Sequence, residues 1–169
     1  MKRTVFQFGL LSATVSIAIM AITVPLLYSH RSRWMDVLGY SSVALSALIV
    51  FFGIRSYRQK TGSGKISFGR AVAVGVLITL VSAVLYVIAF QLMYFQLAPE
   101  YGEKFVSCMV ERDRDRGASE QEVADTARKA RTLKELYDKP STNAMVVFGT
   151  YFPVGLALSA ISAAILKKR

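Results

Sequence analysis

The chain has 169 residues, of which 53% are hydrophobic and 19% are charged, and its formal net charge is +10. One cysteine and one histidine exclude an internal disulfide framework, a four-cysteine zinc site and a metal centre built from several histidines. A basic chain is compatible with nucleic-acid binding only if the basic residues gather on a water-exposed face. The positions of the apolar and basic residues therefore determine the class of protein.

Four long apolar segments follow one another along the chain, at about residues 5–28, 34–54, 69–98 and 142–166. A helix rises about 1.5 Å per residue, so about 20 apolar residues cross a hydrocarbon core of about 30 Å. The segments are too long for single strands and lack the two-residue alternation of a membrane barrel. The first is also longer than the apolar region of a signal peptide, so we expect it to remain in the membrane. The sequence predicts an all-α integral membrane protein, with residues 1–169 forming a single four-helix bundle.

Basic residues are distributed unevenly among the connections between these segments. Residues 2–3, 55–70 and 167–169 contain basic residues and no acidic residue, whereas acidic and basic residues match in number in the remaining connections. Connections on the cytoplasmic side of a membrane carry an excess of Lys and Arg. We therefore expect a multi-pass inner-membrane protein, with both termini cytoplasmic and the loop 100–140 extracytoplasmic.

The second connection carries the densest group of basic residues. They are Arg55, Arg58, Lys60, Lys65 and Arg70. Each basic residue near an anionic membrane surface contributes about 1 kcal/mol of attraction. The sequence predicts contact with anionic headgroups, and an ordinary orientation signal without lipid specificity is the alternative. Because the excess positive charge adjoins membrane segments, we expect no nucleic-acid partner.

The polar insert at residues 99–140 has the pattern of a helical hairpin. Ser119 and Glu122 form a capping-box pattern before the second helix, and Pro99 is expected to break the chain after the third membrane segment. Apolar residues recur at three- and four-residue spacing in both helices: Phe105, Cys108 and Met109 in the first, and Val123, Leu133 and Tyr137 in the second. We predict an outer surface for a partner, and a passive connector is the alternative.

Two rows of small residues run along the third and fourth membrane segments. They comprise Ala71, Gly75, Thr79 and Ala83, and Gly155, Ser159 and Ala163. Small residues allow the backbones of membrane helices to approach closely. The sequence predicts that these rows pack helices within the bundle, and contact between two copies is the alternative.

No ionisable residue lies deep in an apolar segment, which argues against a proton-coupled transporter. The sequence predicts no catalytic residue, no metal and no cofactor. We therefore expect a non-enzymatic accessory or interaction protein that acts through its hairpin, with an unidentified membrane protein or a second copy as partner. A small oligomeric transporter or channel subunit is the alternative, and an intermolecular disulfide through Cys108 stays open.

Four stretches carry a resemblance to a known family. They are residues 1–4 (MKRT), 51–58 (FFGIRSYR), 64–71 (GKISFGRA) and 152–156 (FPVGL). With them, nearly the whole chain resembles the small bacterial membrane proteins grouped as domain of unknown function 4199. The resemblance implies four helices with a polar segment before the last, and it implies no activity and no catalytic residues.

Overall fold

The computed structural model describes residues 1–28, 32–60 and 64–167, without the side chains of residues 26–28, 32–40, 42 and 43. Six α-helices and one π-helical turn, η1, make up this part of the chain. Their bounds are α1 Lys2–Tyr28, α2 Ser32–Lys60, α3 Phe68–Leu92, η1 Met93–Leu97, α4 Tyr101–Asp115, α5 Glu120–Tyr137 and α6 Pro140–Leu166. The described residues form no strand, so the all-α prediction is confirmed for them.

Within the part of the chain that the structure describes, three helical segments are long and apolar enough to cross a membrane. They are Lys2–Pro25, Phe68–Leu97 and Pro140–Leu166, which correspond to the first, third and fourth predicted membrane segments. The second predicted segment falls within α2, where the side chains of residues 34–40, 42 and 43 lie outside the described part. The structure therefore contains three candidate membrane spans, and α2 runs beside them.

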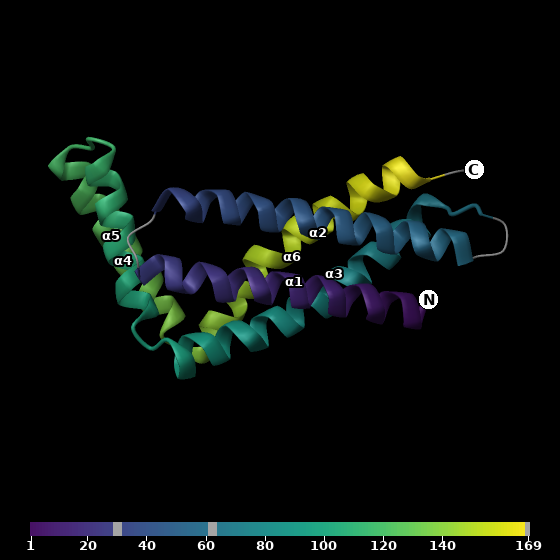
Figure 1. Ribbon diagram of the computed structural model, residues 1–169, viewed down its shortest axis with the longest axis horizontal. Helices are drawn as coiled ribbons and strands as arrows, with labels where there is room; N and C mark the ends of the chain where they lie inside the picture. Colours follow the sequence, from purple (N-terminus) through teal and green to yellow (C-terminus); the bar gives the residue numbers. More distant parts are fainter. Residues whose placement is uncertain (29–31, 61–63, 168–169) are drawn as a thin grey trace.

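The four long helices lie side by side, with the two ends of the chain at the same end of the bundle (Figure 1). Helix α3 contacts α1, α2 and α6. Helices α4 and α5 pack on each other and lie across the opposite end of the bundle. The elements closest in space thus include α3 and α6, which are separated in sequence by the whole α4–α5 segment.

Local sequence signals explain several helix ends. The predicted capping box is present: the Glu122 amide donates to Ser119 Oγ at 3.3 Å, and the Ser119 amide donates to Glu122 Oε2 at 2.8 Å. Pro140 begins α6, where a missing amide hydrogen has no cost. The break expected at Pro99 occurs one residue earlier, at Ala98, after the π-helical turn.

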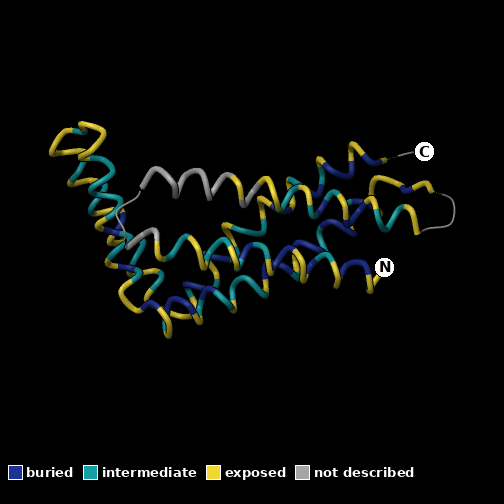
Figure 2. Tube along the Cα trace, viewed as in Figure 1, coloured by how far each residue is buried: buried dark blue, intermediate teal, exposed yellow. Residues whose placement is uncertain are grey.

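Buried residues occur along the length of the bundle (Figure 2), and their side chains differ from one end to the other. Near the chain ends, an aliphatic cluster contains Val50, Ile54, Val74 and Ile78, among others. Near α4 and α5, a second cluster is rich in aromatic rings. Between them lie buried hydroxyl side chains, which belong to Ser12, Ser16, Thr79, Ser82 and Ser159. These five buried hydroxyl groups of the membrane helices therefore lie between the two apolar clusters.

Candidate functional sites

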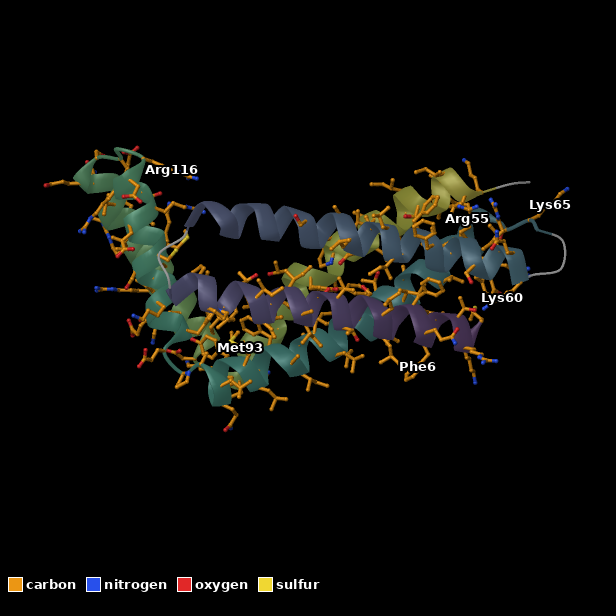
Figure 3. All side chains as sticks on the ribbon, viewed as in Figure 1. Phe6, Arg55, Lys60, Lys65, Met93 and Arg116 are labelled. Atoms are coloured by element: carbon orange, nitrogen blue, oxygen red, sulfur yellow. The ribbon has the colours of Figure 1, made fainter. Side chains whose placement is uncertain are left out.

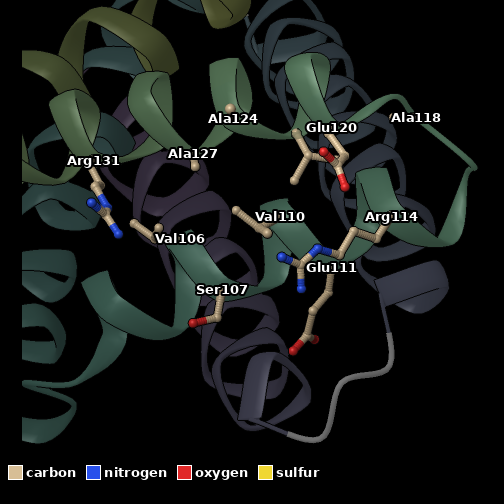
Figure 4. Close-up of a pocket in the computed structure, with 11 residues that line it drawn as sticks. Val106, Ser107, Val110, Glu111, Arg114, Ala118, Glu120, Ala124, Ala127 and Arg131 are labelled. Atoms are coloured by element: carbon tan, nitrogen blue, oxygen red, sulfur yellow. The ribbon is translucent and has the colours of Figure 1, made fainter.

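An open groove of about 800 Å³ runs between α4 and α5 (Figure 4). We call it the α4–α5 groove. It is lined by Val106, Ser107, Val110, Glu111, Arg114, Ala118, Glu120, Val123, Ala124, Ala127 and Arg131. Its valine and alanine side chains supply an apolar floor, and its charged side chains have both signs. Figure 4 looks into the groove with the bundle helices behind it, so the groove opens away from the bundle.

A hydrogen-bonded joint connects this pair of helices to the bundle. The Tyr94 hydroxyl donates to Asp138 Oδ1 at 2.7 Å, and Lys134 Nζ donates to Asp138 Oδ2 at 2.8 Å. Lys134 Nζ also lies 3.3 Å from Glu103 Oε1 on α4. The hydrogen bond from Lys134, followed by that from Tyr94, holds the pKa of Asp138 below its ordinary value. The Asp138 carboxylate thus links η1 to the end of α5, and Lys134 links α5 to Glu103 on α4.

Aromatic rings and side-chain amides reinforce the joint. The rings of Phe90, Tyr94 and Tyr137 lie with centroids 5.8–6.1 Å apart, at distances typical of favourable ring pairs. Asn143 Nδ2 donates to the Tyr137 carbonyl at 2.9 Å, and Gln91 Nε2 donates to the Pro140 carbonyl at 2.9 Å. These contacts fix the start of α6 against the end of α5.

The residues predicted as a partner surface have different positions in the structure. All six, Phe105, Cys108, Met109, Val123, Leu133 and Tyr137, are half-buried. Val123 lines the α4–α5 groove, whereas Phe105 and Tyr137 line a small cavity of about 90 Å³ beside the aromatic joint. The groove instead uses Val106 and Val110, which the sequence analysis missed. Their four-residue spacing, matched by Val123 and Ala127 on α5, is the signal that identifies this face.

Three basic residues of the second connection, Arg55, Lys60 and Lys65, lie at the end of the bundle opposite α4 and α5 (Figure 3). Arg55, Lys60, Lys65 and Arg70 are exposed, whereas Arg58 is half-buried and donates to the Leu166 carbonyl at 3.2 Å. Arg58 therefore ties α2 to the end of α6. At the same end, a second open groove of about 650 Å³ is lined by Met1, Arg3, Thr4, Gln7, Tyr57 and Lys60. Arg3 thus joins Lys60 beside this groove, a pairing that the sequence did not indicate.

The two rows of small residues meet at the interface of α3 and α6. Ala71, Gly75, Thr79, Ala83, Gly155, Ser159 and Ala163 are all buried. A Cβ atom added at Gly75 would lie 2.8 Å from the Ser159 Cβ, and one added at Gly155 would overlap the Thr79 side chain. Each glycine therefore faces a hydroxyl residue of the other helix, and the backbones approach closely because both glycines lack a side chain.

The buried hydroxyl side chains between the two apolar clusters form a directed chain of hydrogen bonds. Ser82 Oγ donates to Ser12 Oγ at 3.2 Å. A hydroxyl has one hydrogen, so the Tyr151 hydroxyl is the donor to Ser82 Oγ at 2.9 Å, and Ser16 Oγ is the donor to Tyr151 at 3.0 Å. This chain joins α1, α3 and α6. The Tyr151 ring also stacks on Tyr86, with centroids 4.9 Å apart.

A cavity of about 180 Å³ adjoins this hydroxyl chain. We call it the hydroxyl cavity. It is lined by Ser12, Ser46, Val50, Thr79, Ser82, Thr150, Tyr151, Val154, Gly155 and Leu158. Thr150 and Val154 are exposed, which places the mouth of the cavity at the outer surface of α6. Sequence reasoning identified these hydroxyl groups one by one as polar residues of membrane helices, and it did not bring them together.

Among the residues that the structure describes, no group of three or more His, Cys, Asp or Glu side chains is placed to hold a metal ion. In the described residues, three apolar helices long enough to cross a membrane, together with a polar pair of helices before the last one, are consistent with a helical membrane protein. The chain belongs to the family described as protein of unknown function (DUF4199), whose model matches residues 7–168. The resemblance seen in the sequence is thereby confirmed. Neither a curated protein nor a solved structure matches the chain.

Proposed function

We propose that this protein is a non-enzymatic accessory protein of the bacterial inner membrane, and that its α4–α5 groove binds an amphipathic helix of another membrane protein. The observation that carries the proposal is an open groove between two helices held on the bundle by the Tyr94–Asp138–Lys134 joint. A surface held in this way is preorganised, which lowers the entropy that binding a partner would cost.

The dimensions of the α4–α5 groove suit a helix. Its lining on α5 extends from Glu120 to Arg131, which corresponds to about 16 Å, or about three helical turns. Helices are recognised by apolar anchors at three- and four-residue spacing, and the valine floor offers such contacts. Arg131 lies near one end of the groove, whereas Glu111, Arg114 and Glu120 lie near the other (Figure 4). The expected occupant has an apolar stripe and an acidic residue facing Arg131.

The direction in which the groove opens favours a partner over a second copy. The groove faces away from the bundle, whereas another copy in the same membrane would stand beside the bundle. An extramembrane helix of a different membrane protein can approach the open side directly.

Photocrosslinking in native membranes tests the proposal. A photoreactive residue at Ala127, which lines the groove, is expected to yield a defined adduct, whereas one at the exposed Lys129 is expected to yield little. Val110→Glu places a charge on the apolar floor and is expected to reduce the Ala127 adduct about tenfold, because burying an unpaired charge is costly.

Thr132→Glu serves as the matched control, since it adds the same charge at an exposed position outside the groove. Equal adducts from Ala127 and Lys129, or an adduct that persists in Val110→Glu, would contradict binding in the groove. An adduct with the mass of two copies of this chain would show self-association in its place.

We also propose that α2 is a fourth membrane helix and that both termini are cytoplasmic. Three facts support this topology: α2 has 29 residues, the two chain ends lie at the same end of the bundle, and the exposed Arg55, Lys60 and Lys65 lie there too. Ends on the same side require an even number of crossings, so α1, α3 and α6 need a fourth. Arg55, Lys60, Lys65 and Arg70 would then meet anionic headgroups on the cytoplasmic side.

Reporter fusions are expected to confirm this topology. A reporter that is active only in the cytoplasm should give signal at the C-terminus and none when inserted after Gly117, in the turn between α4 and α5. A reporter active only outside the cytoplasm provides the control and should give the opposite result. Signal from the cytoplasmic reporter at both positions would overturn the four-crossing topology.

A further inference from the structure

We propose that the hydroxyl cavity binds an uncharged molecule with a single six-membered ring and a hydroxyl group, in the manner of a phenolic head group, which enters from the surrounding lipid. The inference is independent of partner binding at the α4–α5 groove, because the two sites use different residues. It rests on the depth of the cavity, its volume and the direction of its hydrogen bonds.

The depth of the cavity requires a neutral ligand. Its lining on α6 lies between Thr150 and Leu158, near the middle of a helix that runs from Pro140 to Leu166. None of the ten lining residues is Asp, Glu, Lys, Arg or His. A charge at this depth of a membrane is costly without a partner of opposite sign. A molecule that reaches the exposed mouth at Val154 through lipid must therefore be uncharged.

The volume of the cavity matches one ring. A cavity of about 150 Å³ in a protein interior binds benzene, and the hydroxyl cavity measures about 180 Å³. A ring with one small substituent therefore fits. Bound water needs two to four polar partners, whereas much of the wall is aliphatic, formed by Val50, Val154 and Leu158. The shape of the lining thus favours a molecule that has one apolar body and one polar group.

The hydrogen bonds of three lining hydroxyl groups, those of Ser82, Tyr151 and Thr150, favour a ligand that donates a hydrogen bond. Ser82 donates its hydrogen to Ser12, and Tyr151 donates to Ser82, while the Thr150 hydroxyl donates to the Val146 carbonyl at 2.8 Å. The hydrogens of these three hydroxyl groups are already used in hydrogen bonds, but each of the three oxygens retains a lone pair that can accept another. A hydroxyl group on the ligand can use such a lone pair, whereas an ether or a carbonyl group has no hydrogen to offer.

Photolabelling of the full chain in phosphatidylcholine nanodiscs tests this site. The probe is a phenol that carries a diazirine group, and labelled residues are located by mass spectrometry. Labelling is expected in the segments of α2 and α6 that line the cavity. Phenol should compete at a concentration in the bilayer about fivefold lower than anisole or toluene, which corresponds to one additional hydrogen bond.

Two variants that fill the cavity separate binding from simple partition into lipid. Val154→Trp at the mouth and Leu158→Phe in the wall are each expected to reduce labelling of these segments about tenfold, as loss of most of the ring's contacts would. Leu156→Trp is the matched control, because it adds the same ring at an exposed position of α6 outside the cavity, and it should leave labelling unchanged. Circular dichroism should show the same helix content in each variant as in the wild type, which confirms that the variant folds. Equal competition by phenol and anisole would overturn the proposal. Unchanged labelling in both filled variants would also overturn it, as would uniform labelling of all exposed positions of the chain.

Discussion

Replacing Gly155 with valine is expected to lower the free energy of unfolding of the bundle by about 1–3 kcal/mol, the usual cost of overpacking a closely packed interface. A side chain at this position would overlap Thr79, which is itself buried and lies 3.4 Å from Ser159 through their hydroxyl oxygens. Thr79 is branched at Cβ and cannot turn aside freely. Helices α3 and α6 must therefore separate, which also weakens the contact between Gly75 and Ser159.

Unfolding in mixed micelles, followed by circular dichroism, measures this effect. The matched control is Gly149→Val on the same helix, because a Cβ atom at Gly149 meets no atom within 4 Å. The control is expected to change the free energy of unfolding by less than about 0.5 kcal/mol, as surface substitutions usually do. Equal losses in the two variants would show that the cost arises from the helix itself and not from the contact between α3 and α6.

Replacing Asp138 with alanine is expected to loosen α4 and α5 from the bundle. The substitution removes the acceptor of the Tyr94 hydroxyl, and Tyr94 is only 5% exposed. Because Asp138 is exposed and the bond is half-buried, losing it is expected to cost about 0.5–1.5 kcal/mol. Amide hydrogen exchange should become faster in α4 and α5 while the rate in α3 up to Phe90 stays the same. Asp125→Ala is the control, since its ion pair with Arg128 is exposed and surface pairs contribute little.

The same joint is expected to depend on pH. Hydrogen bonds from Lys134 and Tyr94 hold the pKa of Asp138 below its ordinary value in the folded chain. Because this pKa is lowered, the ionised Asp138 carboxylate stabilises the folded chain fully above the pKa of an unfolded aspartate, which is about 3.9. That stabilisation is lost as the pH falls through the pKa of Asp138 in the folded chain. The difference in amide protection of α4 and α5 between the wild type and Asp138→Ala should therefore be largest near pH 7 and become smaller below about pH 4. A difference that stays constant down to pH 2 would exclude the carboxylate as its source.

Much of the secondary structure could be predicted because its signals are local. The capping box at Ser119 and Glu122 and the break expected at Pro99, which the structure places at Ala98, each depend on residues within one or two turns. Long apolar runs predicted three segments that the structure also presents as candidate membrane spans, because crossing a hydrocarbon layer constrains length and composition together.

The composition of the α4–α5 groove could not be predicted from the same patterns. Both helices offer apolar residues on more than one face, and periodicity alone did not distinguish the face with Phe105 from the face with Val106 and Val110. The choice follows from the aromatic joint, which directs Phe105 and Tyr137 toward the bundle. A face already used at the joint is no longer free to line the groove.

The sequence by itself determined that this protein is helical, that it has apolar helices of membrane length, and that small residues line α3 and α6. Only the tertiary structure decided that Ser12, Ser82 and Tyr151 share one hydrogen-bonded chain beside a cavity. The reason is that a serine or threonine in a membrane helix has two ways to form a hydrogen bond with its hydroxyl group. It can bond to its own backbone, as Thr23 does with the Ile19 carbonyl, or to another helix. Residue type is the same in both cases, so the distinction exists only once the helices are packed.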